Sequence, residues 1–288
     1  MDTVLIYGGK GWIGTQLLKY LYKDFNYILS AVRADDEEGV SKELDSIKPT
    51  HVLSIIGRTH GAGFTTIDYL EQSGKLVENV RDNLYGPLVL AIQCKMRNIH
   101  YTYFGTGCIF SKPHEEGSYT EESLPDFTGS GYSTVKGFTD RLFHSNMFNT
   151  NTLNIRIRMP ITDTVNPRNF ITKITTYEKI CSVHNSMTVL PTLLPILVDM
   201  MKNKTVGTIN MTNPGVISHN EILEMYKDII DPTFTWKNFT IEEQDKILAS
   251  KRSNNYLDTS KLQKLYPDVP DIKSAVRTCL HDMKTNMK

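Results

Sequence analysis

The chain has 288 residues, of which 40% are hydrophobic, and its 32 basic and 32 acidic side chains give a formal net charge of zero. This length suits one large domain or one and a half, and the lack of a basic excess argues against a nucleic-acid binder. No apolar run approaches the ~20 residues that a membrane span needs. The segment from Met1 to Tyr7 has no basic region and no cleavage signal, so we expect a cytoplasmic protein without membrane partners.

The cysteines are widely separated and contain no C-x-x-C pair; they are Cys94, Cys108, Cys181 and Cys279. This spacing argues against a disulfide framework and against a structural zinc site. We therefore expect a reducing environment and no bound metal.

Strand and helix patterns alternate along the first half of the chain. Short apolar, β-branched runs predict strands at 3–7, 27–32, 51–56, 101–104 and 153–157, and helical spacing appears at 17–21, 76–96 and 131–143. Such alternation predicts an α/β fold, with a Rossmann-like doubly wound parallel sheet. After residue 160 the pattern weakens to helices at 169–177 and 218–229, with Ser218 as the N-cap, and a strand at 208–211.

Two parts follow from this change of pattern. We expect a dinucleotide-binding domain over residues 1–158, rejoined by about 188–230. The remaining segments, 159–187 and 231–288, are expected to form a smaller C-terminal substrate-binding lobe.

Gly8, Gly11 and Gly14 stand between the first predicted strand and the next helix, which Trp12 and Ile13 begin. The first glycine permits a tight turn, the second lets the backbone approach a pyrophosphate, and the third lets helix and strand pack closely. The amides at the helix N-terminus favour the phosphate charge. This arrangement predicts a dinucleotide site, although a plain tight turn would also use glycines.

The cofactor prediction depends on the end of the second strand, where Arg33 comes first and Asp35 and Asp36 follow. An arginine there accommodates the 2′-phosphate of NADP, whereas an acidic residue favours the free ribose of NAD. We expect NADPH, with NADH as the alternative, and Arg33 could also be a solvated surface charge. Arg58, after the third strand, is expected near the cofactor pyrophosphate.

Tyr132 and Lys136 are spaced i, i+4 and share one helix face. A neighbouring ammonium lowers the pKa of a phenol and makes it a usable proton donor. Thr106 follows the strand at 101–104, at the edge where parallel sheets bind ligands. This order resembles the short-chain dehydrogenase/reductase superfamily, in which the hydroxyl and the tyrosine hold a carbonyl oxygen and the lysine contacts the nicotinamide ribose. Asn83 is either part of this support or a surface amide.

Cys108 lies two residues beyond Thr106. An ordinary thiol, with a pKa of about 8.5, can move protons close to neutrality. Beside a ketone it could remove or return a proton on the adjacent carbon, which a simple reductase does not require. The alternative is a small buried hydrophobic residue.

Longer blocks of sequence extend the resemblance over essentially the whole chain. They are similar to the bifunctional UDP-4-keto-6-deoxyglucose 3,5-epimerase/4-reductases, which form the C-terminal part of plant rhamnose synthases. The blocks are Thr106-Gly107-Cys108-Ile109-Phe110, Phe127-Thr128-Gly129-Ser130, Arg156-Ile157-Arg158-Met159-Pro160, the segment from Asn166 to Lys173, Asn185-Ser186-Met187-Thr188-Val189, Thr212-Asn213-Pro214-Gly215-Val216 and Arg252-Ser253-Asn254-Asn255.

The resemblance implies roles for these residues. Cys108 and Lys173 would be the acid/base pair that inverts carbons 3 and 5, although Lys173 alone would pass for an exposed helix lysine. Tyr132 would then donate a proton during reduction at carbon 4, with Lys136 as its partner and Thr106 as a carbonyl ligand. The residues expected to bind the substrate, including its diphosphate, are Arg252, Asn254 and Asn169.

The partners also follow from the resemblance. The chain lacks an upstream dehydratase domain, so a separate 4,6-dehydratase would supply the nucleotide-sugar substrate. We expect a homodimer that pairs through the long helices beside the sheet. The alternatives are a dTDP-sugar 4-reductase, a redox-neutral nucleotide-sugar epimerase, and a non-catalytic dinucleotide-binding regulatory subunit. The intact Tyr132–Lys136 pair argues against the last.

Overall fold

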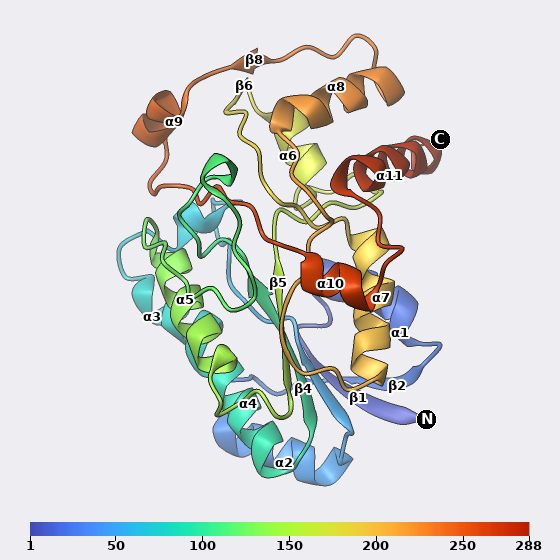
Figure 1. Ribbon diagram of the computed structural model, residues 1–288. Coiled ribbons are helices and arrows are strands. Elements are labelled where there is room, and N and C mark those ends of the chain that lie inside the picture. Colours follow the sequence, from blue (N-terminus) through green and yellow to red (C-terminus); the bar gives the residue numbers. More distant parts are fainter. Residues whose placement is uncertain (288) are drawn as a thin grey trace.

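A parallel sheet of six strands forms the centre of the computed structural model, which describes residues 1–287 (Figure 1). Its order is β2-β1-β3-β4-β5-β7. The strands are β1 (Asp2–Tyr7), β2 (Phe25–Leu29), β3 (His51–Ser54), β4 (His100–Thr106), β5 (Thr152–Ile157) and β7 (Gly207–Asn210). The chain moves outward from β1 to β2 and then returns to β3 on the other side. This reversal places a crevice at the carboxyl ends of β1 and β3, and the predicted doubly wound parallel sheet is confirmed.

Helices cover both faces of the sheet. One layer contains α1 (Trp12–Leu21), α7 (Leu190–Lys202) and α10 (Ser260–Leu265), whose leucines pack with β1 and β5 in one core. The other contains α2 (Glu37–Ile47), α4 (Gly86–Met96) and α5 (Gly131–His144), which share a second core with β3 and β4. Figure 1 shows α3 (Leu76–Val80), α4 and α5 side by side on this layer.

A smaller lobe with its own core lies above the sheet in Figure 1. Isoleucines from α6 (Phe170–Thr176) and α8 (His219–Ile229) pack there against α11 (Ile272–Asn286). Two short strands, β6 (Lys179–Ile180) and β8 (Lys237–Asn238), pair beside them, followed by α9 (Ile241–Ile247). Over residues 1–287, no helix is both long and apolar enough to cross a membrane.

The main differences from the sequence prediction are helices that were not predicted. The charged helix α2 begins where Asp36 accepts a hydrogen bond from the Gly39 amide, at 3.0 Å, so this carboxylate caps a helix. Helix α7 forms despite Pro195 in its interior, because its leucines bury a continuous face. The helix predicted at 76–96 is interrupted by a π-helical turn, η2 (Arg81–Tyr85). The predicted Ser218 N-cap is confirmed.

Candidate active site

The glycine turn lies at the crevice between β1 and β3. Gly8 has φ of 84°, and a Cβ there would come within 2.9 Å of the Ile55 carbonyl carbon. A Cβ on Gly14 would lie 2.5 Å from the carbonyl oxygen of Gly9. Gly11 precedes α1, whose first turn, beginning at Trp12 and Ile13, carries no acidic residue. The uncapped amides and the close backbone approach fit a dinucleotide pyrophosphate.

Three arginines surround one carboxylate beside this crevice. Arg58 Nε and Arg81 Nε each lie 2.7 Å from an oxygen of Asp82, and Arg33 Nη2 lies 3.7 Å from it. Burial raises the pKa of Asp82, but hydrogen bonds from Arg81 and Arg58 outweigh it and hold that pKa below its ordinary value. Arg33 also contacts Asp35 at 2.7 Å but keeps most of its side chain exposed. Arg58 Nε also lies 3.5 Å from Glu78, so Asp35, Glu78 and Asp82 together match the charge of the three arginines.

Asn83 connects the crevice to helix α5. Its side-chain oxygen accepts from the Arg58 amide at 3.1 Å, and its side-chain nitrogen donates to Asn79 at 3.0 Å. Its main-chain carbonyl accepts from Thr139 Oγ1 at 2.7 Å, one turn after Lys136. Asn83 belongs to the π-helical turn η2, and such turns are frequent at functional sites.

Thr106, Cys108 and Tyr132 lie together at the carboxyl end of β4. The Cys108 amide donates to Thr106 Oγ1 at 3.1 Å, and Cys108 packs against Tyr132 in an apolar cluster with Tyr69 and Leu70. Burial raises the pKa of Tyr132 well above its ordinary value; the proximity of Cys108 adds to this, and a hydrogen bond with Thr106 opposes it. The phenol is therefore held protonated, as a proton donor must be.

Lys136 does not have the partner that its spacing suggested. Its Nζ donates to the Tyr103 hydroxyl and, at 3.2 Å, to the Phe104 carbonyl, and it lies 4.4 Å from the centre of the Tyr103 ring. Burial lowers the pKa of Lys136 to about 7, while Asp140 acts in the opposite direction. The expected lowering of the Tyr132 pKa by this ammonium is not found, because burial of the phenol dominates.

Lys173 lies on α6, in the other lobe. Burial lowers its pKa, and the charges of Arg168 and Arg252 add to this effect. Arg252 Nη2 also donates to Asp68 Oδ2 at 2.6 Å. A lysine in this environment is neutral more often than an exposed one, so it is better suited to accept a proton.

The two predicted substrate-binding amides have structural hydrogen bonds. Asn169 Oδ1 accepts from the Ile171 amide at 3.3 Å and caps α6, while its Nδ2 donates to the carbonyls of Thr162 and Thr164. Asn254 Oδ1 accepts from Asn185 Nδ2 at 3.0 Å. Both stay predictions as substrate ligands.

Comparisons with known proteins identify the family of the chain, although no protein-family model matches it. The solved UDP-rhamnose synthase from Acanthamoeba polyphaga mimivirus is 55% identical, with a TM-score of 0.95 over 98% of this chain and 99% of that one. A bifunctional dTDP-4-dehydrorhamnose 3,5-epimerase/reductase from Arabidopsis thaliana is 44% identical over 279 residues, 94% of this chain and 90% of the relative. The chain belongs to this epimerase/reductase family. The predicted family and the prediction of an enzyme are both confirmed.

Two further proteins are similar to the chain, one in sequence and one in fold. A trifunctional UDP-glucose 4,6-dehydratase/epimerase/reductase from Arabidopsis thaliana is also 44% identical, and the match covers 94% of this chain but only 40% of that protein. A dTDP-4-dehydrorhamnose reductase from Bacillus anthracis, solved with NADP, has a TM-score of 0.81 at 16% identity over 96% of this chain and 98% of that one. The second likeness shows a shared fold.

Arg158 belongs to one of the sequence blocks that carry the family resemblance, but the sequence predicted no role for it. It is buried, and it donates to the Gly107 carbonyl at 3.1 Å, to Asn185 Oδ1 at 2.6 Å and to the Ser253 carbonyl at 2.9 Å. These hydrogen bonds connect the turn before Cys108 to segments of the smaller lobe. The sequence feature that could have identified Arg158 is its position directly after the apolar strand predicted at 153–157.

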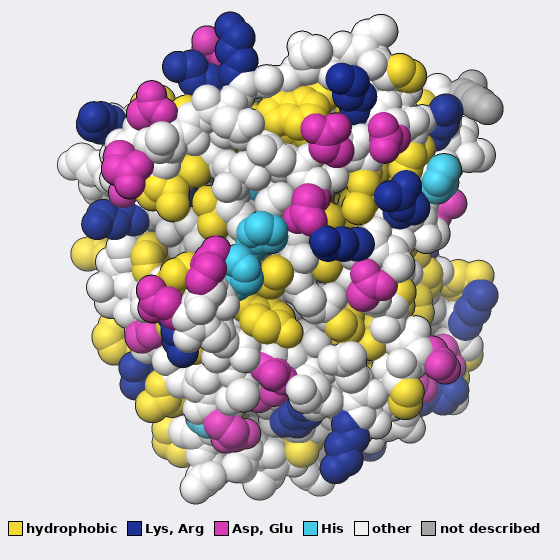
Figure 2. Space-filling view, turned by 45° about the horizontal axis from the view of Figure 1, so that its top comes forward, with side chains coloured by type: hydrophobic (Ala, Val, Ile, Leu, Met, Phe, Trp, Pro, Cys, Tyr) yellow, Lys and Arg dark blue, Asp and Glu magenta, His cyan; other side chains and the backbone are white. Residues whose placement is uncertain are grey.

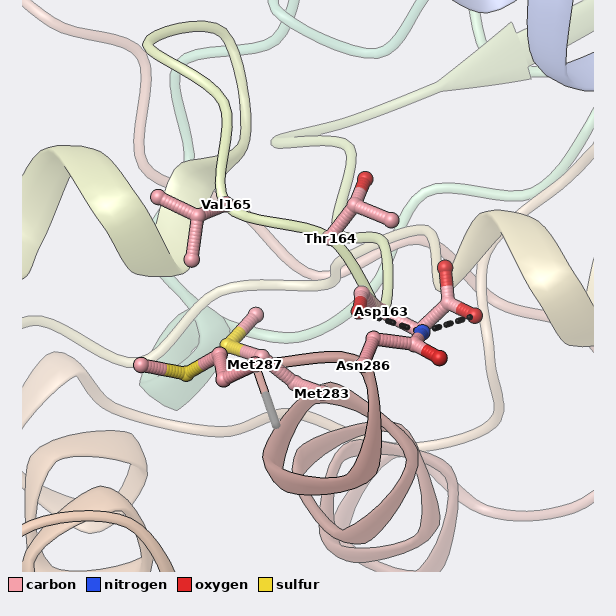
Figure 3. A pocket seen from close by; sticks show the side chains of 6 residues that line it. All are labelled: Asp163, Thr164, Val165, Met283, Asn286 and Met287. Carbon is pink, nitrogen blue, oxygen red and sulfur yellow. Dashed lines mark hydrogen bonds between the residues drawn. The ribbon is translucent and has the colours of Figure 1, made fainter.

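A separate cavity of about 320 Å³ lies between residues 163–165 and the end of α11 (Figure 3). Asn286 Nδ2 closes one side by donating to the Asp163 carbonyl at 3.1 Å and to its carboxylate at 3.2 Å. None of the predicted catalytic residues lines this cavity, so it is not the catalytic pocket.

Proposed function

We propose that the protein is an NADPH-dependent 3,5-epimerase and 4-reductase that converts UDP-4-keto-6-deoxy-D-glucose to UDP-β-L-rhamnose. The observation that carries this proposal is the arrangement of proton-transfer groups in two lobes. Cys108 packs against Tyr132 in one apolar cluster, and its amide donates to Thr106 Oγ1 at the end of β4. Lys173, whose pKa is lowered by burial, belongs to the other lobe.

Epimerisation needs a base on one face of the sugar and an acid on the other. The 4-ketone acidifies the protons on carbons 3 and 5, and hydrogen bonds from Thr106 and Tyr132 to its oxygen stabilise the enolate that forms. One of Cys108 and Lys173 removes the proton, and the other returns a proton to the opposite face. Their placement in different lobes supports this division of roles.

Reduction follows at the same carbonyl. NADPH supplies the hydride to carbon 4 when it is bound in the crevice. Tyr132 would donate its phenol proton to the oxygen; burial raises the pKa of this phenol, so it stays protonated until the developing negative charge on the oxygen draws the proton. Lys136, one helical turn further on, would balance the phenolate that remains, for which its ammonium group must turn from the Tyr103 hydroxyl toward Tyr132. Loss of the ketone ends the exchange at carbons 3 and 5 and makes the product final.

The ligand-binding roles follow from charge. The glycine turn of Gly8, Gly11 and Gly14 would hold the cofactor pyrophosphate, and Arg33 would contact the 2′-phosphate that distinguishes NADPH from NADH. Arg252, beside Lys173, would contact the substrate diphosphate. The ion pair between Arg252 and Asp68 would have to break or lengthen when the diphosphate binds.

A homodimer fits the exposed outer layer. Tyr85 at the end of η2 is 45% exposed, Ile92 and Met96 on α4 are 40% and 73% exposed, and Phe138 on the neighbouring α5 is 59% exposed. Large apolar side chains gathered on adjacent helices mark an interaction surface. The four cysteines are free and three are buried, which fits a reducing compartment such as the cytoplasm. A separate 4,6-dehydratase would supply the substrate there.

Product analysis tests this function. The purified protein is incubated with NADPH and either UDP-4-keto-6-deoxy-D-glucose or its dTDP counterpart, and the products are identified by NMR. We expect UDP-β-L-rhamnose, with the UDP substrate preferred. Reduction without inversion would identify a simple 4-reductase, inversion without NADPH oxidation a redox-neutral epimerase, and no reaction with either substrate a non-catalytic subunit.

A further inference from the structure

Two histidines and a glutamate meet on the surface, away from the catalytic cluster. His114 and Glu115 belong to the short helix η3 (His114–Glu116), between β4 and α5, and His184 lies between β6 and α7. The two imidazole rings are 4.7 Å apart between centroids. One ligand atom from each of the three residues lies within 4.8 Å of the other two. Figure 2 shows two histidine side chains side by side near the middle of its face, with acidic side chains nearby.

One ring nitrogen of this cluster has no well-directed hydrogen bond. Within the described chain, the buried Nδ1 of His114 has no hydrogen-bond partner, although the Glu115 carboxylate oxygen lies only 2.9 Å away. The two atoms form an ion pair when the imidazole is protonated, and a neutral His114 can instead present its Nδ1 lone pair to a cation that Glu115 shares. A further carboxylate, that of Glu221, lies 3.4 Å from His184 Nε2 and is held in place by Lys273 at 2.7 Å.

Two imidazoles and one carboxylate are a ligand set that divalent first-row transition metals prefer. Zinc accepts three such protein ligands and completes its tetrahedron with water. Zinc–nitrogen bonds of about 2.0–2.1 Å place tetrahedral ligands roughly 3.3 Å apart. The three ligand atoms therefore need to converge by up to about 1.5 Å, which partly exposed side chains can do by rotation.

We propose that His114, Glu115 and His184 bind a divalent transition-metal ion of the Zn²⁺ class, with Glu221 orienting His184. The ion would join the β4–α5 connection, which carries Cys108 at its start, to the lobe that carries Lys173. The proposal is independent of the proposed reaction. The expectation of no metal came from cysteine spacing, and this cluster contains no cysteine.

Metal titration of the full-length protein tests the proposal. After treatment with EDTA and its removal, Zn²⁺ is titrated by calorimetry, and Co²⁺ is followed by its visible absorption. We expect one equivalent of Zn²⁺ to bind and to raise the thermal midpoint, because a ligand that binds only the folded state stabilises it. His114→Ala and His184→Ala should each weaken binding at least tenfold and abolish the rise in the midpoint.

Two matched variants separate this site from others. His144→Ala removes a histidine that lies 3.4 Å from one glutamate, Glu122, and should bind Zn²⁺ as the parent does. Cys108→Ser removes the candidate catalytic thiol and should also retain binding. The metal-free midpoints of the two cluster variants check that both remain folded. Three results would overturn the proposal. They are absence of Zn²⁺ binding by the parent protein, binding as tight as the parent's in both His114→Ala and His184→Ala, and loss of Zn²⁺ binding in Cys108→Ser.

Discussion

The buried ion pair between α5 and β5 provides the sharpest prediction of stability. Arg156 Nη2 and Nε contact the Asp140 carboxylate at 2.6 and 2.8 Å, and the two side chains are 0% and 2% exposed. Arg156→Met leaves that carboxylate buried, with the Asn154 amide as a remaining donor at 3.0 Å. Removing one partner of such a pair costs about 3–5 kcal/mol, because a buried charge loses its compensation. The thermal midpoint should fall by about 6–20 °C, at roughly 2–4 °C per kcal/mol for a chain of this size.

A double-mutant cycle measured by urea unfolding tests this value. Arg156→Met and Asp140→Leu are made singly and together, and circular dichroism gives the free energy of unfolding of each protein. Because replacing both partners by apolar groups is often near neutral, the double variant should lose at least about 1 kcal/mol less than the sum of the single losses. Lys42→Met, in the exposed pair with Glu38, is the control and should change little. The reasoning would be refuted if either single variant lost no more free energy of unfolding than the control. It would also be refuted if the loss in the double variant equalled the sum of the single losses.

Three further predictions concern the crevice and the active site. Gly14→Ala places a Cβ 2.5 Å from the Gly9 carbonyl oxygen, so NADPH should bind at least about tenfold more weakly by fluorescence titration; an unchanged Kd would contradict this. Arg33→Ser should weaken NADPH about tenfold and leave NADH unchanged, whereas equal losses would remove Arg33 from the 2′-phosphate site. Burial lowers the pKa of Lys136 to about 7, while an unfolded lysine titrates at about 10.4, so the unfolded chain binds more protons between these pH values. The free energy of unfolding should therefore rise with pH there, and Lys136→Met should reduce the slope; an unchanged slope would argue against a buried, neutralised amine.

The parallel sheet could be predicted because its strands are short apolar runs separated by helical spacing and turns. Helix α7 could not, since Pro191 and Pro195 resemble helix breakers until its leucines are seen to bury one face. Helix α2 is mostly charged, and the sequence pattern predicted no helix there. Its capping by Asp36 depends on the local backbone.

In the candidate site too, residues could be predicted from local sequence patterns, whereas contacts between distant parts of the chain could not. Tyr132 and Thr106 were found because strand order places them at one edge of the sheet. The hydrogen bond of Lys136 to Tyr103 could not be predicted, since it joins residues 33 positions apart. The same holds for Arg158, whose partners lie in three separate segments, and for His184 beside His114.

Proton exchange in heavy water tests the central claim, that one carbonyl site first inverts and then reduces the sugar. UDP-4-keto-6-deoxy-D-glucose is incubated with the enzyme in heavy water without NADPH, and deuterium is located by NMR and mass spectrometry. We predict deuterium at carbons 3 and 5, its loss in Cys108→Ala, and its retention in Tyr132→Phe, which should instead fail to reduce carbon 4 when NADPH is added. Undiminished exchange in Cys108→Ala, or undiminished reduction in Tyr132→Phe, would contradict the roles assigned to these two residues.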